Sequence, residues 1–121
     1  MLTKHEKIDE KRIDLDILDT YLGKNYCVFD IETTGFSRSN DIITLACMLV
    51  CKEDELSMIQ YFAESPEEES LIIEKTIPVL TNCDAVFTYN GRAFDIPFFI
   101  ERAKRTAMAY KNTASHDICN I

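Results

Sequence analysis

The sequence predicts an α/β fold in which helices flank a mixed β-sheet. Short apolar runs rich in β-branched residues alternate with longer segments of helical periodicity. The first three runs are joined by short turns, which favour antiparallel neighbours, and a helix separates the third run from the fourth, which makes the fourth strand parallel to an earlier one. With 121 residues, the chain is expected to build one main domain.

The first 24 residues are charged and carry a weak helical stripe that ends at Gly23, a suitable C-cap. The stripe consists of Ile13, Ile17, Leu18, Tyr21 and Leu22. We therefore expect residues 1–24 to form an N-terminal helical arm, and residues 25–121 to form the domain itself.

Three strands are predicted at the start of the domain. The first begins at Tyr26 and ends in two acids, the second covers residues 41–50, and the third covers residues 56–63. Residues 35–40 form the first turn, and residues 52–55 form a charged hairpin turn. These strands should make an antiparallel meander.

A helix is predicted to begin at Ser65. Ser65 is a suitable N-cap, Pro66 stands at the first helical position, and Glu68 would close a capping box. Pro78 should kink or tighten the last turn. Residues 83–89 then form a short buried strand, parallel to a preceding one.

A second helix is predicted around Pro97, and residues 115–121 should begin one more strand. The buried stripe of this second helix is expected to consist of Ile96, Phe99, Ile100, Ala103 and Ala107. A basic group lies on its other side, namely Arg102, Lys104, Arg105 and Lys111. We interpret this group as a solvated face that complements the helix C-terminus, with a contact to backbone phosphates as the alternative.

Charge and hydropathy limit the possible functions. A formal net charge of −8 excludes a general nucleic-acid coat or a membrane-surface protein, but not an enzyme that holds one strand end through metal ions. No apolar run reaches the length of a transmembrane helix, and the N-terminus lacks the apolar segment of a signal peptide. We expect a cytoplasmic protein.

Five cysteines, an odd number without a Cys-x-x-Cys pair, argue against a disulfide framework. They are Cys27, Cys47, Cys51, Cys83 and Cys119. His5 and His116 are far from any cysteine cluster, so zinc is not expected. We predict reduced cysteines that mostly fill the core.

Acidic residues at the ends of two predicted strands form the candidate site. Side chains alternate along a strand, so Asp30 and Glu32 point to one face, about 6–7 Å apart. Asp95 lies just beyond the strand of residues 83–89, and it converges on this pair if the two strands are parallel neighbours. On its own, Asp95 would be interpreted as a helix cap, but Asp30 and Glu32 opposite it favour a metal site. Three carboxylates suit Mg²⁺ or Mn²⁺, and two such ions activate a water and stabilise a leaving 3′-oxygen.

These residues resemble a known family. Asp30-Ile-Glu32-Thr-Thr-Gly35 resembles the first motif of the DEDD-type 3′→5′ exonucleases, which have the ribonuclease H-like fold. The segment from Tyr89 to Phe99, with an Asn ahead of an aromatic-Asp pair, resembles the second motif. The bacterial branch of predicted exonuclease domains is the most similar, and the resemblance covers residues 18–121.

The resemblance implies a sheet of order 3-2-1-4-5 with the first three strands antiparallel. It implies Asp30, Glu32 and Asp95 as catalytic metal ligands for Mg²⁺ or Mn²⁺. It further implies that Thr33, Thr34, Asn90 and Phe94 bind a single-stranded 3′ end of RNA or DNA.

The family's third motif, a Tyr or His followed by a fourth Asp, has no counterpart in the chain. His116-Asp117 falls where the family has its fifth strand, whose Asp is not a metal ligand. We therefore expect a two-metal site without its fourth ligand, in a domain that stops before its C-terminal part.

Three functional hypotheses remain open. The first is a metal-dependent nuclease, weak or inactive as this chain, because losing members of a catalytic set can cost most of the rate. The second is a non-catalytic remnant that retains the fold and cation binding. The third is an aspartyl-phosphate phosphotransferase of the Asp-x-Asp-x-Thr type, which is disfavoured because the second acid is Glu32 and Gly35 follows two threonines.

Overall fold

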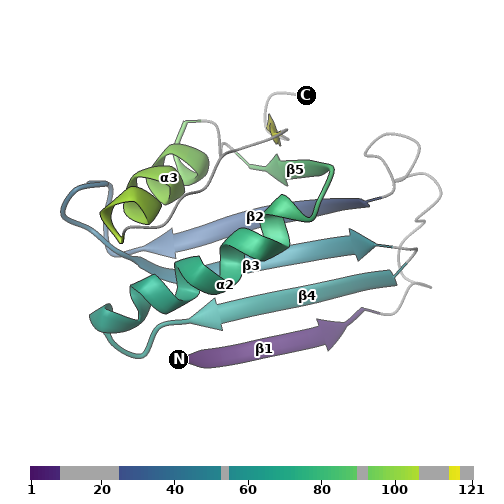
Figure 1. Ribbon diagram of the computed structural model, residues 1–121, viewed down its shortest axis with the longest axis horizontal. Helices are drawn as coiled ribbons and strands as arrows, with labels where there is room; N and C mark the ends of the chain where they lie inside the picture. Colours follow the sequence, from purple (N-terminus) through teal and green to yellow (C-terminus); the bar gives the residue numbers. More distant parts are fainter. Residues whose placement is uncertain (9–24, 53–54, 90–92, 107–114, 118–121) are drawn as a thin grey trace.

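A single mixed sheet forms the body of the computed structural model (Figure 1), which describes residues 1–8, 25–52, 55–89, 93–106 and 115–117. Within these residues the sheet has six strands in the order β1-β4-β3-β2-β5-β6. The two long helices, α2 and α3, lie on the same face of the sheet. The predicted α/β class is confirmed.

The central meander consists of β2 (Asn25–Thr33), β3 (Ile43–Lys52) and β4 (Glu55–Phe62), paired antiparallel. Beyond β2, the strand β5 (Ala85–Thr88) pairs parallel with β2, and β6 (Ser115–Asp117) pairs parallel with β5. The five strands predicted from sequence thus occur in the predicted order. The observed sheet differs by one further strand at its edge.

That edge strand, β1 (Leu2–Lys7), corrects the expectation of a helical arm over residues 1–24. It runs antiparallel to β4, with Leu2 opposite Phe62 and Lys7 opposite Ser57. All six of its side chains are exposed, so β1 is held mainly by the backbone hydrogen bonds that it offers to an otherwise open sheet edge. The predicted helical stripe between residues 13 and 22 lies outside the described residues.

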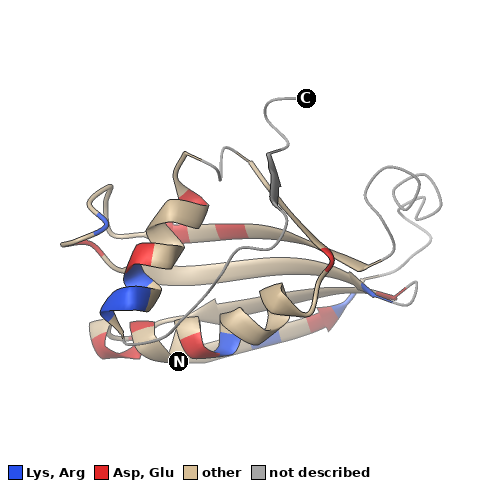
Figure 2. Cartoon of the chain, turned by 45° about the horizontal axis from the view of Figure 1, so that its top comes forward, with Lys and Arg blue, Asp and Glu red and all other residues tan. Residues whose placement is uncertain are grey.

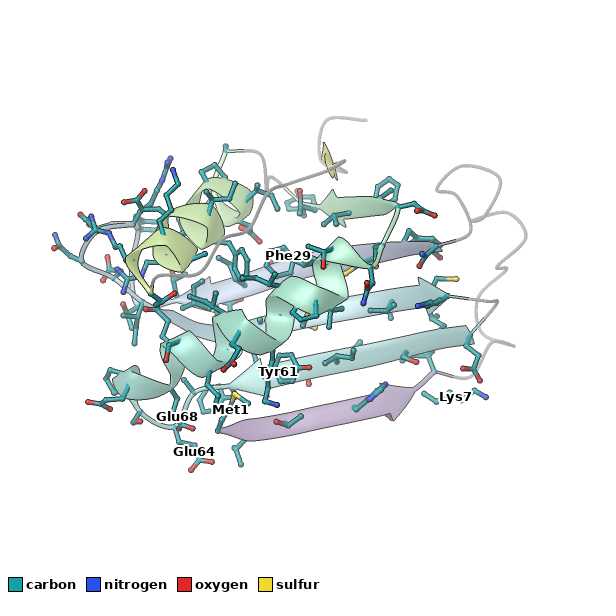
Figure 3. All side chains as sticks on the ribbon, in the orientation of Figure 1. Met1, Lys7, Phe29, Tyr61, Glu64 and Glu68 are labelled. Carbon is teal, nitrogen blue, oxygen red and sulfur yellow. The ribbon has the colours of Figure 1, made fainter. Side chains whose placement is uncertain are left out.

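The chain start is anchored next to the first helical turn. The Met1 ammonium lies 3.7 Å from the carboxylate of Glu64 and forms an ion pair with Glu68, as the labelled residues in Figure 3 show. The hydrogen bond between Glu68 and this ammonium lowers the pKa of the Glu68 carboxyl. Glu68 also accepts a hydrogen bond from the backbone N–H of Glu64 at 3.0 Å.

These contacts change the predicted helix start. Pro66 opens a short 3₁₀ turn, η2 (Pro66–Glu68), and the α-helix α2 (Glu69–Thr81) follows. Ser65 has the extended backbone of an N-cap but makes no side-chain capping bond. The predicted capping box is therefore half formed: the bond from the Ser65 side chain is missing, whereas the Glu68 carboxylate interacts with the backbone N–H of Ser65 as well as with that of Glu64. Pro78 is accommodated inside α2.

The main core lies between the sheet and the two helices, α2 and α3 (Asp95–Arg105). Phe29 of β2 packs edge-on against Phe99 of α3, with ring centroids 5.5 Å apart. A second cluster lies on the other face of the sheet and contains Tyr26, Cys51, Leu56 and Phe87.

Of the described cysteines, Cys27, Cys51 and Cys83 are buried, as predicted. Cys119 lies outside the described residues. In the part of the chain that the structure describes, no helix is long and apolar enough to cross a membrane.

Candidate functional site

Two of the predicted acids lie side by side on one face of β2. The strand alternates as expected, with Cys27, Phe29 and Ile31 buried under the helices and Asp30 and Glu32 exposed. The pairing of β2 with β3 is irregular between Glu32 and Thr33, where β2 gives way to the following loop. Both carboxylates therefore lie near the carboxyl end of the strand.

Asp95 comes from a distant part of the sequence and meets this end of β2. It is the first residue of α3, it is only 5% exposed, and its Oδ2 accepts a hydrogen bond from the Ile31 N–H at 3.3 Å. The parallel pairing of β5 with β2 places the chain that leaves β5 beside the end of β2. The convergence predicted from strand topology is thus present for Asp95 and the β2 backbone.

The electrostatics of Asp95 show a carboxylate that lacks a compensating cation. Burial, then the negative charge of Asp30, and then a hydrogen bond with the Asp30 side chain together raise the pKa of Asp95 to about 7, against the opposing effect of the Ile31 N–H. Glu32 makes the smallest of these contributions. Among the described residues, neither Asp30 nor Asp95 has an ion pair with a basic side chain.

The carboxylates of this site meet part of what a hard divalent cation requires. Asp30 and Asp95 supply the oxygen ligands that Mg²⁺ and Mn²⁺ prefer, and Glu32 lies on the same face two residues along β2. However, no three His, Cys, Asp or Glu side chains within the described residues are gathered closely enough to hold a metal ion. Figure 2 shows acidic residues on β2 and at the start of α3, whereas basic residues gather at the other end of that helix.

The loop after β2 is fixed by Asp41. The Thr34 hydroxyl donates to Asp41 Oδ1 at 3.0 Å, and the Ser37 N–H donates to Oδ2 at 2.9 Å. A Cβ on Gly35 would lie 2.5 Å from Oδ2, so a larger residue at this position would have to displace the Asp41 carboxylate. Thr33 donates to the Gly35 carbonyl at 2.6 Å. Thr33 and Thr34 therefore shape the loop, and their contact with a nucleotide stays a prediction.

Phe36 is a candidate binding residue that the sequence analysis missed. Its side chain is 88% exposed, and its ring meets that of Phe94 edge-on at 5.9 Å. Phe94 precedes Asp95 and also contacts Phe98. An aromatic residue directly after the glycine of the acidic motif was the available signal. Asn90, also predicted to bind substrate, lies outside the described residues.

The predicted solvated basic face of the second helix does not include Arg102, which is a correction to the sequence-based expectation. Its side chain is only 12% exposed and pairs with Glu69 of α2, a contact across 33 residues that no local pattern indicates. Lys104 and Arg105 are exposed as predicted, and Arg105 pairs with Glu101 at 3.3 Å. Lys111 lies outside the described residues.

The family model of the RNase H superfamily matches residues 27–120. The chain belongs to this superfamily. A search of curated protein sequences finds no match.

Solved structures share the fold of this RNase H superfamily chain at low identity. A family B DNA polymerase from the archaeon Pyrobaculum calidifontis superposes with a TM-score of 0.68 at 18% identity, covering 80% of this chain and 16% of the polymerase. Exonuclease I of E. coli, in a zinc-bound complex with single-stranded DNA, gives 0.65 at 11% identity, covering 78% of this chain and 28% of that one. Its complex with a dT13 oligonucleotide gives the same values. The chain thus spans less than a third of the length of these proteins.

Proposed function

We propose that this RNase H superfamily chain hydrolyses phosphodiester bonds at the 3′ end of single-stranded nucleic acid with the help of Mg²⁺ or Mn²⁺. The observation that carries the proposal is the buried Asp95 carboxyl in hydrogen-bond contact with Asp30. Two acids in contact, one of them buried, are costly without a cation, and a divalent ion bound there would remove the cost. The exonuclease I complexes with single-stranded DNA support the choice of substrate class.

Each residue has a role set by its place. Asp30 and Asp95 would hold the cation, with Glu32 reaching it from the same face of β2, and the bound ion supplies Lewis-acid chemistry and an activated water. The Ile31 N–H orients the Asp95 carboxylate through Oδ2. Phe36 and Phe94 offer an aromatic surface next to Asp95 on which a terminal base can stack, and such stacking tolerates any base.

The acidic composition agrees with end-on binding. A net charge of −8 repels a phosphate backbone, so affinity must come from the cations and from stacking. Binding confined to a strand end needs few basic contacts, whereas a long tract of nucleic acid would need many. The same argument leaves RNA and DNA equally acceptable.

A second function, cation and strand binding without hydrolysis, is favoured by one observation. Glu32 is exposed and affects Asp95 least, and within the described residues no three potential ligands are gathered. A site with two close ligands would hold a divalent cation weakly and orient it poorly.

The experiment uses the full chain with Mn²⁺ and 5′-labelled single-stranded DNA or RNA, and it follows the release of nucleotides. The variant Asp95→Asn keeps an oxygen that can accept from Ile31 but removes the charge, and it should lower the rate roughly 10²-fold or more. The matched control is Asp84→Asn, an exposed residue before β5.

Three outcomes are informative. Release that depends on Asp95 but not on Asp84 supports the nuclease. Intact substrate at high protein concentration, together with a Mn²⁺-dependent rise in Tm that Asp95→Asn abolishes, supports binding without hydrolysis. Release that persists in Asp95→Asn contradicts the proposed site.

A further inference from the structure

Glu69 holds three parts of the fold together. It is the first residue of α2, it is 4% exposed, and its Oε2 accepts the Ile43 N–H of β3 at 2.7 Å. Its Oε1 accepts Nη2 of Arg102 at 2.6 Å, and its Oε2 accepts Nε of Arg102 at 2.9 Å. Two parallel bonds of this kind fix the guanidinium plane as well as its charge.

The remaining nitrogen of Arg102 reaches a different element. Nη1 donates to the carbonyl of Arg38 at 3.2 Å and to that of Ser39 at 3.4 Å. Both carbonyls belong to loop 35–41, the segment that follows the acidic motif. Arg102 therefore connects α2 and α3 to this loop.

Loop 35–41 is thus attached to α3 at two places. Near the helix start, the Phe36 ring contacts Phe94, and near the helix end, Arg102 holds the carbonyls of residues 38 and 39. Inside the loop, the Asp41 N–H donates to the Ser37 carbonyl at 2.7 Å, which keeps the segment compact. A compact loop held at both ends moves as one piece with α3, and α3 also carries Asp95.

We propose that Arg102, held by Glu69, is a positioning residue for substrate binding: it fixes loop 35–41 on α3 and thereby places Phe36 beside Phe94 to receive the terminal base. The inference rests on the proposed function, since it assumes that a strand end binds at this edge. In this proposal Arg102 itself contacts neither the substrate nor the three acids of the site, Asp30, Glu32 and Asp95. Its effect reaches the strand only through the loop.

The chemistry of arginine explains why this position needs it. The guanidinium presents donors in a rigid fork, so two nitrogens can hold a carboxylate while the third holds a carbonyl. A lysine would keep the charge opposite Glu69, but its single ammonium cannot span both partners. Arg102→Lys therefore removes the loop contact while keeping the ion pair. Arg105→Lys is the matched control on the same helix, because Arg105 is exposed and its ion-pair partner within the described residues, Glu101, lies on the same helix.

The first measurement reports on the loop alone and requires no nuclease activity. Backbone hydrogen exchange in residues 35–41 should become about tenfold faster in Arg102→Lys and stay unchanged in Arg105→Lys, because a loop that loses contacts opens more often. The sequence contains no tryptophan, so Phe36→Trp adds a single tryptophan, whose fluorescence under selective excitation reports the same change. Equal exchange in both variants overturns the inference whether or not the chain is a nuclease.

The second measurement separates positioning from catalysis. With a single-stranded oligonucleotide and Mn²⁺, Arg102→Lys should raise KM about five- to tenfold and leave kcat within about twofold, because it weakens stacking and not the acid site. A fall in kcat at constant KM contradicts the positioning role. If the unchanged protein neither binds nor cleaves the oligonucleotide, the proposed function fails, and the exchange experiment still tests the loop contact.

A double variant separates positioning from a merely structural role. Glu69→Gln with Arg102→Met removes both charges together and keeps an acceptor for the Ile43 N–H, so it should be more stable than Glu69→Gln alone. Oligonucleotide binding should stay weak, because the loop contacts of Arg102 are still missing. Recovery of binding together with stability would overturn the inference.

Discussion

Glu69 and Asp95 are two buried carboxylates in closely similar settings. Each is the first residue of a helix, each is 4–5% exposed, and each accepts a backbone N–H from a neighbouring strand, Ile43 for Glu69 and Ile31 for Asp95. They differ in the next neighbour. Glu69 meets the Arg102 guanidinium, and the hydrogen bond to Glu69 raises the Arg102 pKa, whereas Asp95 meets a second acid, Asp30.

This difference distinguishes a buried carboxylate that stabilises the fold from one that lowers its stability. Burying a charge is costly unless an opposite charge and hydrogen bonds compensate for it. Glu69 has that compensation within the protein. Asp95 lacks it among the described residues and has instead a pKa raised to about 7. We infer that Asp95 serves ligand binding at the expense of stability.

The strongest test of the comparison is Glu69→Gln. It leaves the Arg102 guanidinium buried without its counter-charge, so the free energy of unfolding should fall by about 3 kcal/mol. Urea denaturation measures the change. The control Glu101→Gln removes the exposed partner of Arg105 and should change stability by less than about 0.5 kcal/mol. Equal losses in the two variants would show that burial of the pair is unimportant.

The same kind of substitution at the other carboxylate should act in the opposite direction. In EDTA at pH 8, Asp95→Asn should raise the free energy of unfolding by about 1–3 kcal/mol, because it removes a buried charge beside Asp30. Asn can still accept the Ile31 hydrogen bond. A loss of stability at pH 8 would contradict the comparison.

The pH profile of this difference follows from the shifted pKa. The Asp95 pKa is about 7 when folded and near 3.8 when unfolded, so between these values the folded state binds more protons. The contribution of Asp95 to stability therefore falls as the pH rises from about 4 to about 7. The advantage of Asp95→Asn should be present above pH 7 and absent below pH 4. Denaturation of both proteins across this range measures it.

The smallest expected effect concerns a third carboxylate, Asp41, which backbone and hydroxyl donors satisfy. Gly35→Ala would place a Cβ 2.5 Å from Asp41 Oδ2 and displace the carboxylate from Ser37 and Thr34. We expect a loss of about 1 kcal/mol, the scale of one or two exposed hydrogen bonds. Thermal denaturation measures it, with the exposed Ser39→Ala as control. An unchanged Tm would show that Asp41 moves freely.

Much of the candidate site could be predicted because it depends on local rules. Alternation along a strand places Asp30 and Glu32 on one face, and a strand-helix-strand unit makes β5 parallel to β2. Together these rules bring Asp95 to the same edge. Strand topology was therefore sufficient to predict that Asp30 and Asp95, 65 residues apart in the sequence, lie close together.

The errors have an equally physical cause. Nothing within residues 2–7 shows that β4 offers an open edge to pair with, so β1 was expected to be helical. Arg102 has the spacing of a solvated basic residue, and only the packing of α2 against α3 reveals Glu69 beside it. The exposure of Phe36 likewise depends on a loop shaped by Asp41 and Arg102.

The sequence by itself determined the strands from β2 to β6, their order and the common face of Asp30 and Glu32, because periodicity and short connections encode these features. Tertiary structure decided that the buried Glu69 pairs with the cationic Arg102, whereas the buried Asp95 has no such partner among the described residues. That decision depends on the neighbours that packing supplies across tens of residues, where the cost of burying a charge is either compensated or left for a ligand to relieve.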